Sequence, residues 1–378
     1  MDNQLTVNYQ LERMQAAVER FGHPERKYKV IHVGGTSGKG STCAMIASIL
    51  QAAGYNVGLF TSPALVTETE RITVNGKPIR KLVPPVDVNL TEFEQYTLAA
   101  LSYFADRQVD YAVIEVGIGG KFDATNIVQP TVAIVTDIGL DHMDILGKTK
   151  QIIARDKQDI IKPGCIGLTG STFIKRGTYI DLSKFKLKQA DLTGSVFDYK
   201  HLKDVQLNWV GHYQIRNAIL AIEAVQRLGI GSAAIRYGLK TVQSRGRFEV
   251  VNRKPLIILD GAHNPQKMSA FTHSLKQLVP LKDKTVICLC SIKSTKDLIN
   301  TLKPLLSLVD EIILTTFPNS YSLTQLEKAV KKLDKTIKIK KLTDSTAAFK
   351  YFKKKLTKQD VGIVTGSLYL IGKILPLL

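Results

Sequence analysis

The stretch Val30-Ile-His-Val-Gly-Gly-Thr-Ser-Gly-Lys-Gly-Ser-Thr-Cys-Ala-Met-Ile-Ala-Ser-Ile-Leu50 is the most informative part of this sequence. Its apolar start, residues 30–33, predicts a buried strand, followed by a glycine-rich loop and then by apolar residues at helical spacing. Such a loop lets backbone N–H groups approach a phosphate, and the first helical turn presents unpaired N–H donors. Lys39 adds a cation that can reach terminal phosphates, and Ser41 or Thr42 supplies a hydroxyl suited to Mg²⁺.

This loop departs from the standard phosphate-binding pattern at two positions. Val33 stands where the pattern has its first glycine, and Ser41 follows Lys39 by two positions. The alternative interpretation is a glycine-rich turn with an incidental lysine. The strand, loop and helix in succession favour nucleotide binding.

Length and composition indicate an ordinary globular protein. The 378 residues exceed what one hydrophobic core usually holds, so we expect two domains, and 44% hydrophobic with 22% charged residues is typical of soluble chains. The sequence has no apolar run near the roughly 20 residues that span a bilayer, and its start does not resemble a secretory signal. We expect a cytoplasmic monomer that does not bind membranes. The cysteines lack metal-site spacing, and Cys288 and Cys290 are expected as buried thiols.

The net charge of +19 is compatible with nucleic-acid binding or with an anionic substrate. Much of the excess lies late in the chain, where lysines alternate with apolar residues as on the solvated faces of strands and helices. Aromatic residues suited to base stacking do not interleave with them. We therefore expect no nucleic-acid partner. The lysines concerned are Lys331, Lys332, Lys335, Lys338, Lys340, Lys341, Lys353, Lys354 and Lys355.

Hydrophobic periodicity predicts strands that alternate with helices. Asn75-Gly76 predicts a tight turn, residues 82–90 have the composition of a connector, and residues 165–209 can be placed only as short strands and loops. In the first 240 residues we expect helices at 11–21, 92–106, 148–161, 212–228 and 230–239, and strands at 30–33, 56–60, 71–74, 109–116 and 131–136.

A second alternation begins after Ser244-Arg-Gly-Arg247, which we interpret as a hinge. We expect strands at 248–251, 256–259, 286–290, 312–315, 337–340 and 362–365, with helices at 266–278, 298–306, 323–333 and 347–356. This part has no glycine-rich fingerprint, which argues against a dinucleotide. The prediction is an α/β protein: a phosphate-loop domain with a mostly parallel sheet at residues 1–244, and a smaller Rossmann-like domain at 245–378.

Several polar side chains stand where predicted strands end, and ligands gather at the C-terminal ends of parallel strands. We interpret Glu115 as a Mg²⁺ ligand in preference to a structural cap. His142 is open to metal, general-base and structural roles, and Ser62 to turn and ligand roles. Asp260-Gly-Ala-His-Asn-Pro265 either faces an interdomain cleft or forms an Asx turn before a helix, and Arg247 is either a phosphate clamp or a linker charge.

Together these motifs resemble the folylpolyglutamate synthase/dihydrofolate synthase family of the Mur ligase superfamily, in family order and across nearly the whole chain. The matching segments are Gly35-Thr-Ser-Gly-Lys-Gly-Ser-Thr42, Thr61-Ser-Pro63, Glu70-Arg-Ile72, Thr91 to Glu94, Glu115-Val-Gly-Ile-Gly-Gly-Lys-Phe-Asp-Ala-Thr-Asn126, Ile138-Gly-Leu-Asp-His142, Ile153-Ala-Arg-Asp-Lys157, Ile160-Ile-Lys-Pro-Gly164, Gly211-His-Tyr-Gln214, Asn217, Gly246-Arg-Phe-Glu249, Asp260-Gly-Ala-His-Asn-Pro265 and Gly366-Ser367.

The resemblance implies roles for many of these residues. Lys39 and its neighbours would hold the ATP phosphates, and Mg²⁺ would be bound by Glu115 and His142 with a hydroxyl from Ser41 or Ser62. Lys157 matches the lysine that the family carbamylates, which turns a cation into an anionic oxygen ligand. The phosphate-loop contacts would be Gly35, Thr36, Ser37, Gly38, Lys39, Gly40, Ser41 and Thr42, and the further ATP contacts across the domain interface Asn217, Arg247, Asp260 and His263.

The reaction implied by the resemblance is amide ligation. A substrate carboxylate attacks the γ-phosphorus of ATP and becomes an acyl phosphate, and the amine of L-glutamate then displaces phosphate. The side chains that would carry it by positioning and charge neutralisation are Lys39, His142, Lys157 and Arg247. Closure of the hinge at residues 244–247 is expected to accompany it.

The chain departs from the family pattern, partly around the pteroate side. Ala64, Thr69 and Lys121 replace His, Asn and Arg, the Trp-Pro pair before Gly246 is missing, and the segments 82–90 and 165–209 and the N-terminal arm are short. Our candidates for pterin contacts are Glu94, Asp123 and Thr125. The alternatives are a Mur-type ligase for another carboxylate and a nucleotide-binding protein with a regulatory or nucleic-acid role.

Overall fold

A computed structural model of the chain describes residues 11–81, 89–243 and 245–378. Most of the predicted connector at 82–90, and the first residue of the predicted hinge, therefore lie outside the described residues. The described chain forms two compact units. Unit 1 takes its residues from 1–62, 68–185 and 216–242, and unit 2 from 63–67, 186–215 and 243–378. The predicted division between residues 244 and 245 stays a prediction.

Unit 1 is built on an eight-stranded sheet in the order β4-β3-β2-β5-β1-β6-β7-β8. Neighbouring strands are parallel along the row β2-β5-β1-β6-β7-β8. At the other end of the sheet, β3 pairs antiparallel with β2 and with β4. Asn75 and Gly76 form the tight turn between β3 and β4, as predicted. The strand bounds are β1 Lys29–Gly34, β2 Val57–Phe60, β3 Ile72–Val74, β4 Lys77–Pro78, β5 Tyr111–Glu115, β6 Val132–Val135, β7 Ile166–Thr169 and β8 Thr178–Tyr179.

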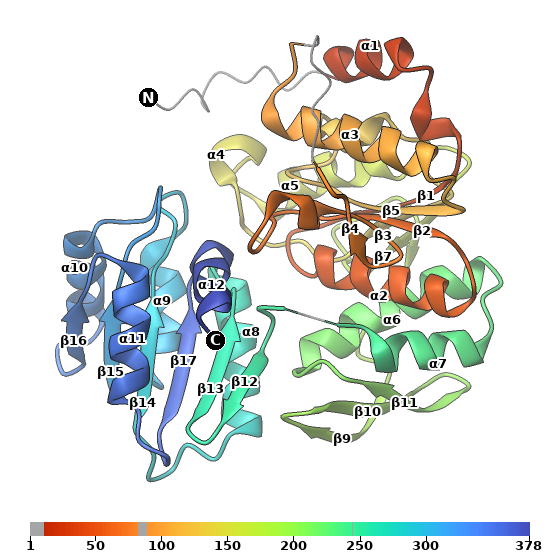
Figure 1. Ribbon diagram of the computed structural model, residues 1–378. Coiled ribbons are helices and arrows are strands. Elements are labelled where there is room, and N and C mark those ends of the chain that lie inside the picture. The colour runs from red at the N-terminus through yellow and green to blue at the C-terminus, as the bar shows by residue number, and fades with distance from the viewer. Residues whose placement is uncertain (1–10, 82–88, 244) are drawn as a thin grey trace. The chain divides into compact units, whose positions relative to one another are not determined.

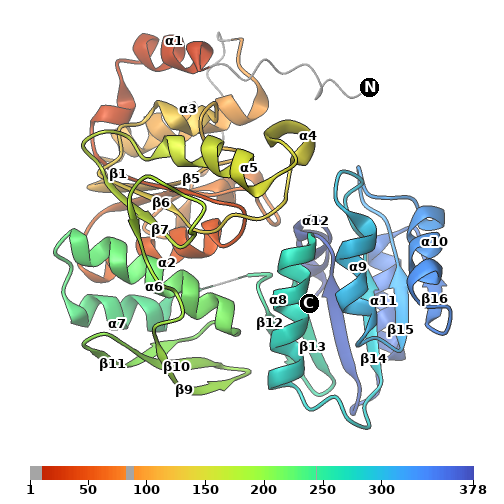
Figure 2. The ribbon, with the colours of Figure 1, turned by 180° about the vertical axis from the view of Figure 1, so that it is seen from behind.

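Helices cover both faces of this sheet (Figures 1 and 2). α1 and α3 pack on one face, where Leu98 and Phe104 of α3 join Val30, Ala112 and Ile114 in a buried cluster. α3 begins with a capping box at Thr91 and Glu94, which satisfies two backbone N–H groups. The helix bounds in unit 1 are α1 Glu12–Arg20, α2 Lys39–Ala52, α3 Glu92–Asp106, α4 Met143–Leu146, α5 Lys150–Lys157 and α7 Ser232–Thr241, and α6, His212–Arg227, begins in unit 2 and continues into unit 1.

Unit 2 contains a six-stranded sheet in the order β12-β13-β17-β14-β15-β16, parallel except for β12, and a three-stranded antiparallel sheet in the order β11-β10-β9. Side chains of β14 alternate between two buried clusters. Cys288 and Cys290 face the cluster that includes α8 and α9, and Ile287 and Leu289 face the one that includes α11 and α12. Both cysteines are buried, as predicted.

The bounds in unit 2 are β9 Lys186–Asp191, β10 Gly194–Tyr199, β11 Leu202–Leu207, β12 Glu249–Arg253, β13 Leu256–Asp260, β14 Val286–Cys290, β15 Glu311–Leu314, β16 Lys338–Lys341, β17 Val361–Thr365, α8 Pro265–Leu278, α9 Leu298–Leu306, α10 Leu323–Leu333, α11 Ser345–Lys355 and α12 Leu368–Ile374. The predicted α/β class with a mostly parallel sheet and a second, Rossmann-like sheet is confirmed. The sequence analysis missed two short helices, α4 and α12.

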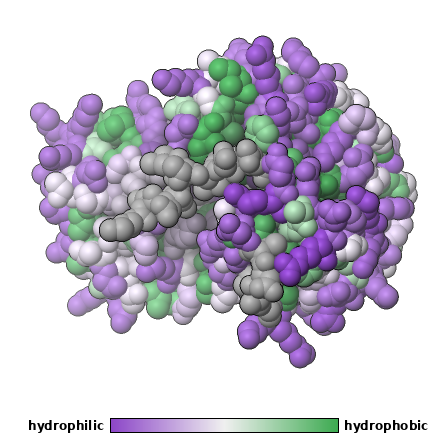
Figure 3. Space-filling view, turned by 90° about the horizontal axis from the view of Figure 1, so that it is seen from above, coloured by the Kyte–Doolittle hydropathy of each residue, from purple (hydrophilic) through white to green (hydrophobic). Residues whose placement is uncertain are grey.

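Within the described residues, no helix combines the length and the apolar character that crossing a membrane requires. The face in Figure 3 is mostly hydrophilic (purple), interrupted by smaller apolar areas (green). This agrees with a chain in which charged residues exceed one in five.

Helix α2 is held by close contact with α7, because Gly238 has no side chain. A Cβ at Gly238 would lie 2.5 Å from the Cα of Ile49, and the Ser48 hydroxyl donates to the Gly238 carbonyl at 2.8 Å. Since the neighbouring atoms are backbone, they cannot move aside cheaply.

We predict that Gly238→Ala destabilises the protein by about 1–3 kcal/mol, because the two helices must separate. Urea unfolding followed by circular dichroism measures this. The matched control is Gly231→Ser, at the N-cap of α7, where a Cβ meets nothing within 4 Å. Equal unfolding midpoints for the two variants would contradict the close packing.

Candidate functional site

The loop between β1 and α2 has the conformation that its glycines permit. Gly35 has φ +132° and Gly38 has φ +86°, values that residues with a Cβ rarely adopt. A Cβ at Gly35 would lie 2.1 Å from the Thr136 hydroxyl, and one at Gly38 would lie 2.3 Å from Oδ1 of Asn217. Asn217, predicted as an ATP contact, is therefore beside the phosphate loop in unit 1.

Two threonines brace this loop, and the sequence analysis did not identify either role. The Thr36 hydroxyl donates to the Gly139 carbonyl at 3.2 Å and accepts from the Gly139 N–H at 3.0 Å. The Thr136 hydroxyl, just after β6, donates to the Ser37 carbonyl at 2.6 Å. The loop is therefore tied to the segment that follows β6. A polar residue at the end of an apolar strand was the available signal for Thr136.

The first turn of α2 is rich in donors and cationic. Lys39 Nζ donates to the Gly35 carbonyl at 3.2 Å, which folds its side chain back over the loop, and the turn has no acidic residue. Ser41 and Thr42 are buried, and the Thr42 hydroxyl has no hydrogen-bond partner among the described residues. Such a helix start attracts anions.

Glu115 ends β5 and lies against the same helical turn. Its Oε2 accepts from the Ser62 N–H at 3.0 Å, and a Cβ at Gly40 would lie 3.1 Å from that oxygen. The predicted ligands Glu115 and Ser62 are thus close together, next to the helical turn that carries Ser41, and all three side chains offer the hard oxygen atoms that Mg²⁺ prefers. The described residues contain no group of three or more His, Cys, Asp and Glu side chains able to hold a metal. Mg²⁺ does not require one, since it uses one or two carboxylates together with phosphate and water.

His142 follows β6 and precedes α4 in a left-handed conformation, φ +50°. Its N–H donates to Oδ1 of Asp141 at 3.0 Å, and its Nε2 lies 3.9 Å from the same oxygen. About a third of the His142 side chain is exposed, so it remains accessible to a ligand.

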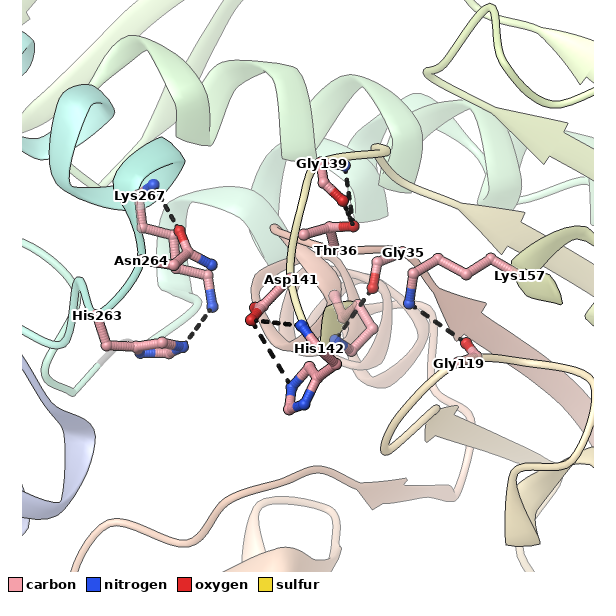
Figure 4. Close-up of polar contacts among 11 residues, drawn as sticks. Gly35, Thr36, Gly119, Gly139, Asp141, His142, Lys157, His263, Asn264 and Lys267 are labelled. Atoms are coloured by element: carbon pink, nitrogen blue, oxygen red, sulfur yellow. Dashed lines mark hydrogen bonds and ion pairs between the residues drawn. The ribbon is translucent and has the colours of Figure 1, made fainter. Parts of the chain in front are cut away.

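Lys157 is the last residue of α5, and its side chain is buried. Its Nζ donates to the Gly119 carbonyl at 3.4 Å. Burial and, to a smaller extent, the positive charge of Lys39 lower the pKa of Lys157 to about 7, against the opposing effects of Asp156, Asp123 and Asp141. The two lysines and the loop after β6 are therefore close enough to interact electrostatically. Figure 4 draws the contacts of Lys157, His142 and the phosphate loop.

The candidates for pterin contacts have internal partners. Glu94 accepts from the Thr91 N–H at 2.7 Å and pairs with Arg13 at 3.0 Å. Asp123 and Thr125 are buried and hydrogen-bonded to each other at 2.5 Å. These contacts account for their burial, and a substrate role for them stays a prediction.

In unit 2, Asp260 at the end of β13 accepts from the Ala262 N–H at 2.7 Å and from the Phe248 N–H at 2.8 Å. The first contact is the Asx turn considered above. Burial raises the pKa of Asp260, and the charge of the half-buried Arg247 opposes this. Tyr213, which the sequence analysis did not single out, lies 3.5 Å from Asp260.

His263 continues the same loop of unit 2. Its Nδ1 lies 2.8 Å from the Gly261 carbonyl, and its Nε2 lies 3.2 Å from Nζ of Lys267 (Figure 4). Asn264 caps α8 by accepting from the Lys267 N–H at 2.9 Å. Asp260, Arg247 and His263 are thus gathered around the end of β13 and the start of α8.

The Mur ligase middle domain family matches residues 33–164, and the Mur ligase, glutamate ligase domain family matches residues 246–368. The dihydrofolate synthase/folylpolyglutamate synthase of Bacillus subtilis is 33% identical over 96% of this chain and 94% of its own length.

Solved structures are similar over the whole chain. Escherichia coli FolC in complex with DHPP and ADP is 30% identical, with a TM-score of 0.86 over 99% of this chain and 94% of its own. The bifunctional folylpolyglutamate synthase/dihydrofolate synthase of Yersinia pestis, complexed with AMPPNP and a Mn ion, is 29% identical, with a TM-score of 0.85 over 100% and 95%.

The low pKa of Lys157 predicts how stability depends on pH. Below pH 7 the amine is protonated in the folded and unfolded states, so burial destabilises the fold in full; above the ordinary pKa of 10.5 it is neutral in both. Between pH 7 and pH 9, the free energy of unfolding of the wild type should therefore rise by roughly 2–3 kcal/mol relative to that of Lys157→Met.

Urea titrations at both pH values, in buffer freed of carbon dioxide to keep the amine unmodified, measure this difference. The exposed Lys148, just before α5, provides the control variant Lys148→Met, whose stability should follow the wild type at both pH values. A constant gap between the wild type and Lys157→Met would show that Lys157 titrates normally.

Proposed function

Because this chain belongs to the dihydrofolate synthase/folylpolyglutamate synthase family of Mur ligases, we propose that it is an ATP-dependent ligase that joins L-glutamate to dihydropteroate, to folates, or to both. The observation that carries the proposal is the meeting of Lys39, Glu115 and Lys157 where β1 and β5 end. The lysines and the start of the helix can bind the phosphates of a nucleoside triphosphate, and the carboxylate can bind its divalent cation.

The phosphate loop would bind the triphosphate through the backbone N–H groups of residues 35–42 and through Lys39. Mg²⁺ would be held by Glu115, by the hydroxyl of Ser41 or Ser62, and by His142. When bound, the cation neutralises charge on the phosphate oxygens. Asn217, which lies beside Gly38, would contact ATP, and Arg247, Asp260 and His263 would be further ATP contacts.

The reaction needs no nucleophilic side chain, because the site acts by positioning the substrates. An oxygen of the substrate carboxylate attacks the γ-phosphorus, the bond to the β-phosphate oxygen breaks, and ADP leaves. The amine of L-glutamate then attacks the carbonyl carbon of the acyl phosphate, and inorganic phosphate leaves as the amide forms. Lys39 would stabilise charge on the transferred group, which is the main catalytic contribution available to this site.

We further propose that Lys157 is carbamylated in the active protein. Its neutral amine would attack carbon dioxide and lose a proton, giving a carbamate. A pKa of about 7 supports this because it leaves neutral amine at neutral pH. The carbamate would place anionic oxygens beside Lys39, where the unmodified Lys157 places a second positive charge.

The carboxylate substrate is the less constrained part of the proposal. Lys121, where the family has Arg, stacks over the exposed Phe122 ring at 4.9 Å and has lost the planar guanidinium. Glu94, Asp123 and Thr125 remain the candidates for pterin contacts. A cytoplasmic monomer remains the expectation from sequence.

We predict that ADP is released only when a pteroate or folate and L-glutamate are both present with ATP and Mg²⁺. Mass spectrometry should show the addition of one or more glutamate residues to the folate. Lys39→Ala should lower kcat/KM by at least about 100-fold, because it removes a phosphate-binding charge, whereas Lys77→Ala, in the exposed strand β4, should not.

Other outcomes separate the alternatives. Glutamate-dependent release with a different carboxylate would keep the ligase and replace the substrate. Release stimulated by nucleic acid and independent of glutamate would point to the regulatory or nucleic-acid reading and remove the ligase.

Carbamylation has its own test. Protein incubated with ¹³C-bicarbonate should give one carbamate carbonyl signal by NMR that is absent in Lys157→Ala. We expect Lys157→Ala to lose at least about tenfold in kcat, because the site then lacks an anionic ligand. A signal that persists in the variant, or none in the wild type, would refute the modification.

A further inference from the structure

His32 lies at the centre of unit 1 and has no place in the reaction described above. It is on β1, two residues before the phosphate loop, between Ile114 of β5 and Ala133 of β6. Its side chain is fully buried, and burial lowers the pKa of His32 to about 3, so the imidazole is neutral. A neutral imidazole donates from one nitrogen only.

Its hydrogen bonds have a defined direction. Asp123 accepts on Oδ1 from the Thr125 N–H at 3.0 Å and on Oδ2 from the Ile118 N–H at 2.9 Å, as a carboxylate does. The single Thr125 hydroxyl proton is donated to Asp123 at 2.5 Å. The Thr125 oxygen can then only accept from Nε2 of His32, 2.8 Å away. This assigns the proton to Nε2, and Nδ1 indeed has no hydrogen-bond partner among the described residues.

Asp123 closes the loop of residues 117–123 on itself, and that loop packs directly on Lys157. A Cβ at Gly120 would lie 2.8 Å from the Cα of Lys157, and the Gly119 carbonyl accepts from Lys157 Nζ at 3.4 Å. The Lys121 N–H also donates to the Asp156 carbonyl at 3.1 Å. The position of Lys157 Nζ therefore depends on where this loop is held.

We propose that His32 is a positioning residue: through the Thr125 hydroxyl and the Asp123 carboxylate it fixes the loop of residues 117–123, and with it Lys157, relative to the phosphate loop. The same strand thus carries the phosphate loop at its end and, two residues earlier, the donor that locks the neighbouring loop. The activity readout of this proposal rests on the proposed ligase function, whereas the structural readouts below do not.

A positioning role for Asp123 and Thr125 makes predictions that differ from those of the pterin contact considered above. If Thr125 contacts the substrate, a substitution of Thr125 should change the KM of the pteroate. A substitution of His32 should then leave that KM unchanged, because His32 is behind Thr125 and has no exposed surface. A positioning chain predicts the same defect from either residue, mainly in kcat.

The variants come in matched pairs. Thr125→Val keeps the shape but removes the hydroxyl, and Thr125→Ser keeps the hydroxyl. His32→Leu removes the donor, and His32→Gln keeps an N–H at the reach of Nε2. The control for loss of a buried hydroxyl is Thr272→Val in α8, whose hydroxyl donates to the Met268 carbonyl at 2.9 Å.

We expect Thr125→Val and His32→Leu each to lower kcat by about 10–100-fold, with the KM values of ATP and pteroate within about threefold of wild type, because a small displacement of a reacting-site group costs this much. Thr125→Ser, His32→Gln and Thr272→Val should stay within about threefold. The double variant His32→Leu/Thr125→Val should be no slower than either single one, since both break one chain.

Hydrogen exchange measured by mass spectrometry tests the loop without any substrate. A peptide covering residues 117–123 should exchange at least about tenfold faster in Thr125→Val and His32→Leu, and as in wild type in the conservative variants. Nitrogen NMR of the imidazole should show the Nε2–H form for His32. Equal exchange in Thr125→Val and Thr125→Ser, or an Nδ1–H form, would overturn the proposal even if the protein proves to have no ligase activity.

Discussion

The parallel register of β5, β1 and β6 is the constraint on which the site depends. Neighbouring parallel strands end at the same edge of a sheet. Three segments therefore lie close together without long connecting loops: the phosphate loop after β1, Glu115 at the end of β5, and the segment after β6. Hydrogen bonds then fix the distances. Thr36 and Thr136 tie the phosphate loop to the segment after β6, and Glu115 accepts from the N–H of Ser62, which follows β2.

Without a ligand, the positive charges at the phosphate loop are not fully balanced by nearby carboxylates. Lys39 and the buried Lys157 repel each other, and this repulsion adds to the burial that lowers the pKa of Lys157 to about 7, against the opposing effect of nearby carboxylates. Repulsion of this kind is relieved by phosphate, by neutralisation of one amine, or by its conversion into an anion. Destabilisation that a ligand removes is a common property of binding sites.

Elements with strong periodicity could be predicted almost to the residue, and contacts between them could not. α3 and α9 have the predicted bounds, and Glu115 could be placed at a strand end because it interrupts an apolar run. Residues 165–209 lacked a clear period because β9 is exposed or half-buried along its length, β10 is mostly buried, and register shifts interrupt the pairing of β10 with both of its neighbours. The bond from Thr125 to His32 joins residues 93 positions apart, and no local pattern in the sequence encodes such a pair. The assignment of Asp123 and Thr125 to a substrate could not be weighed without it.

The close contact between Gly238 and Ile49 also connects the site to the stability of unit 1. α2 begins at the phosphate loop, and its later turns pack against α7. An anion bound at the start of α2 would therefore also stabilise the packing of α2 against α7 and against the sheet. Binding at the phosphate loop should then slow hydrogen exchange at the backbone amides of α7, so that the exchange rate of α7 reports whether the loop is occupied.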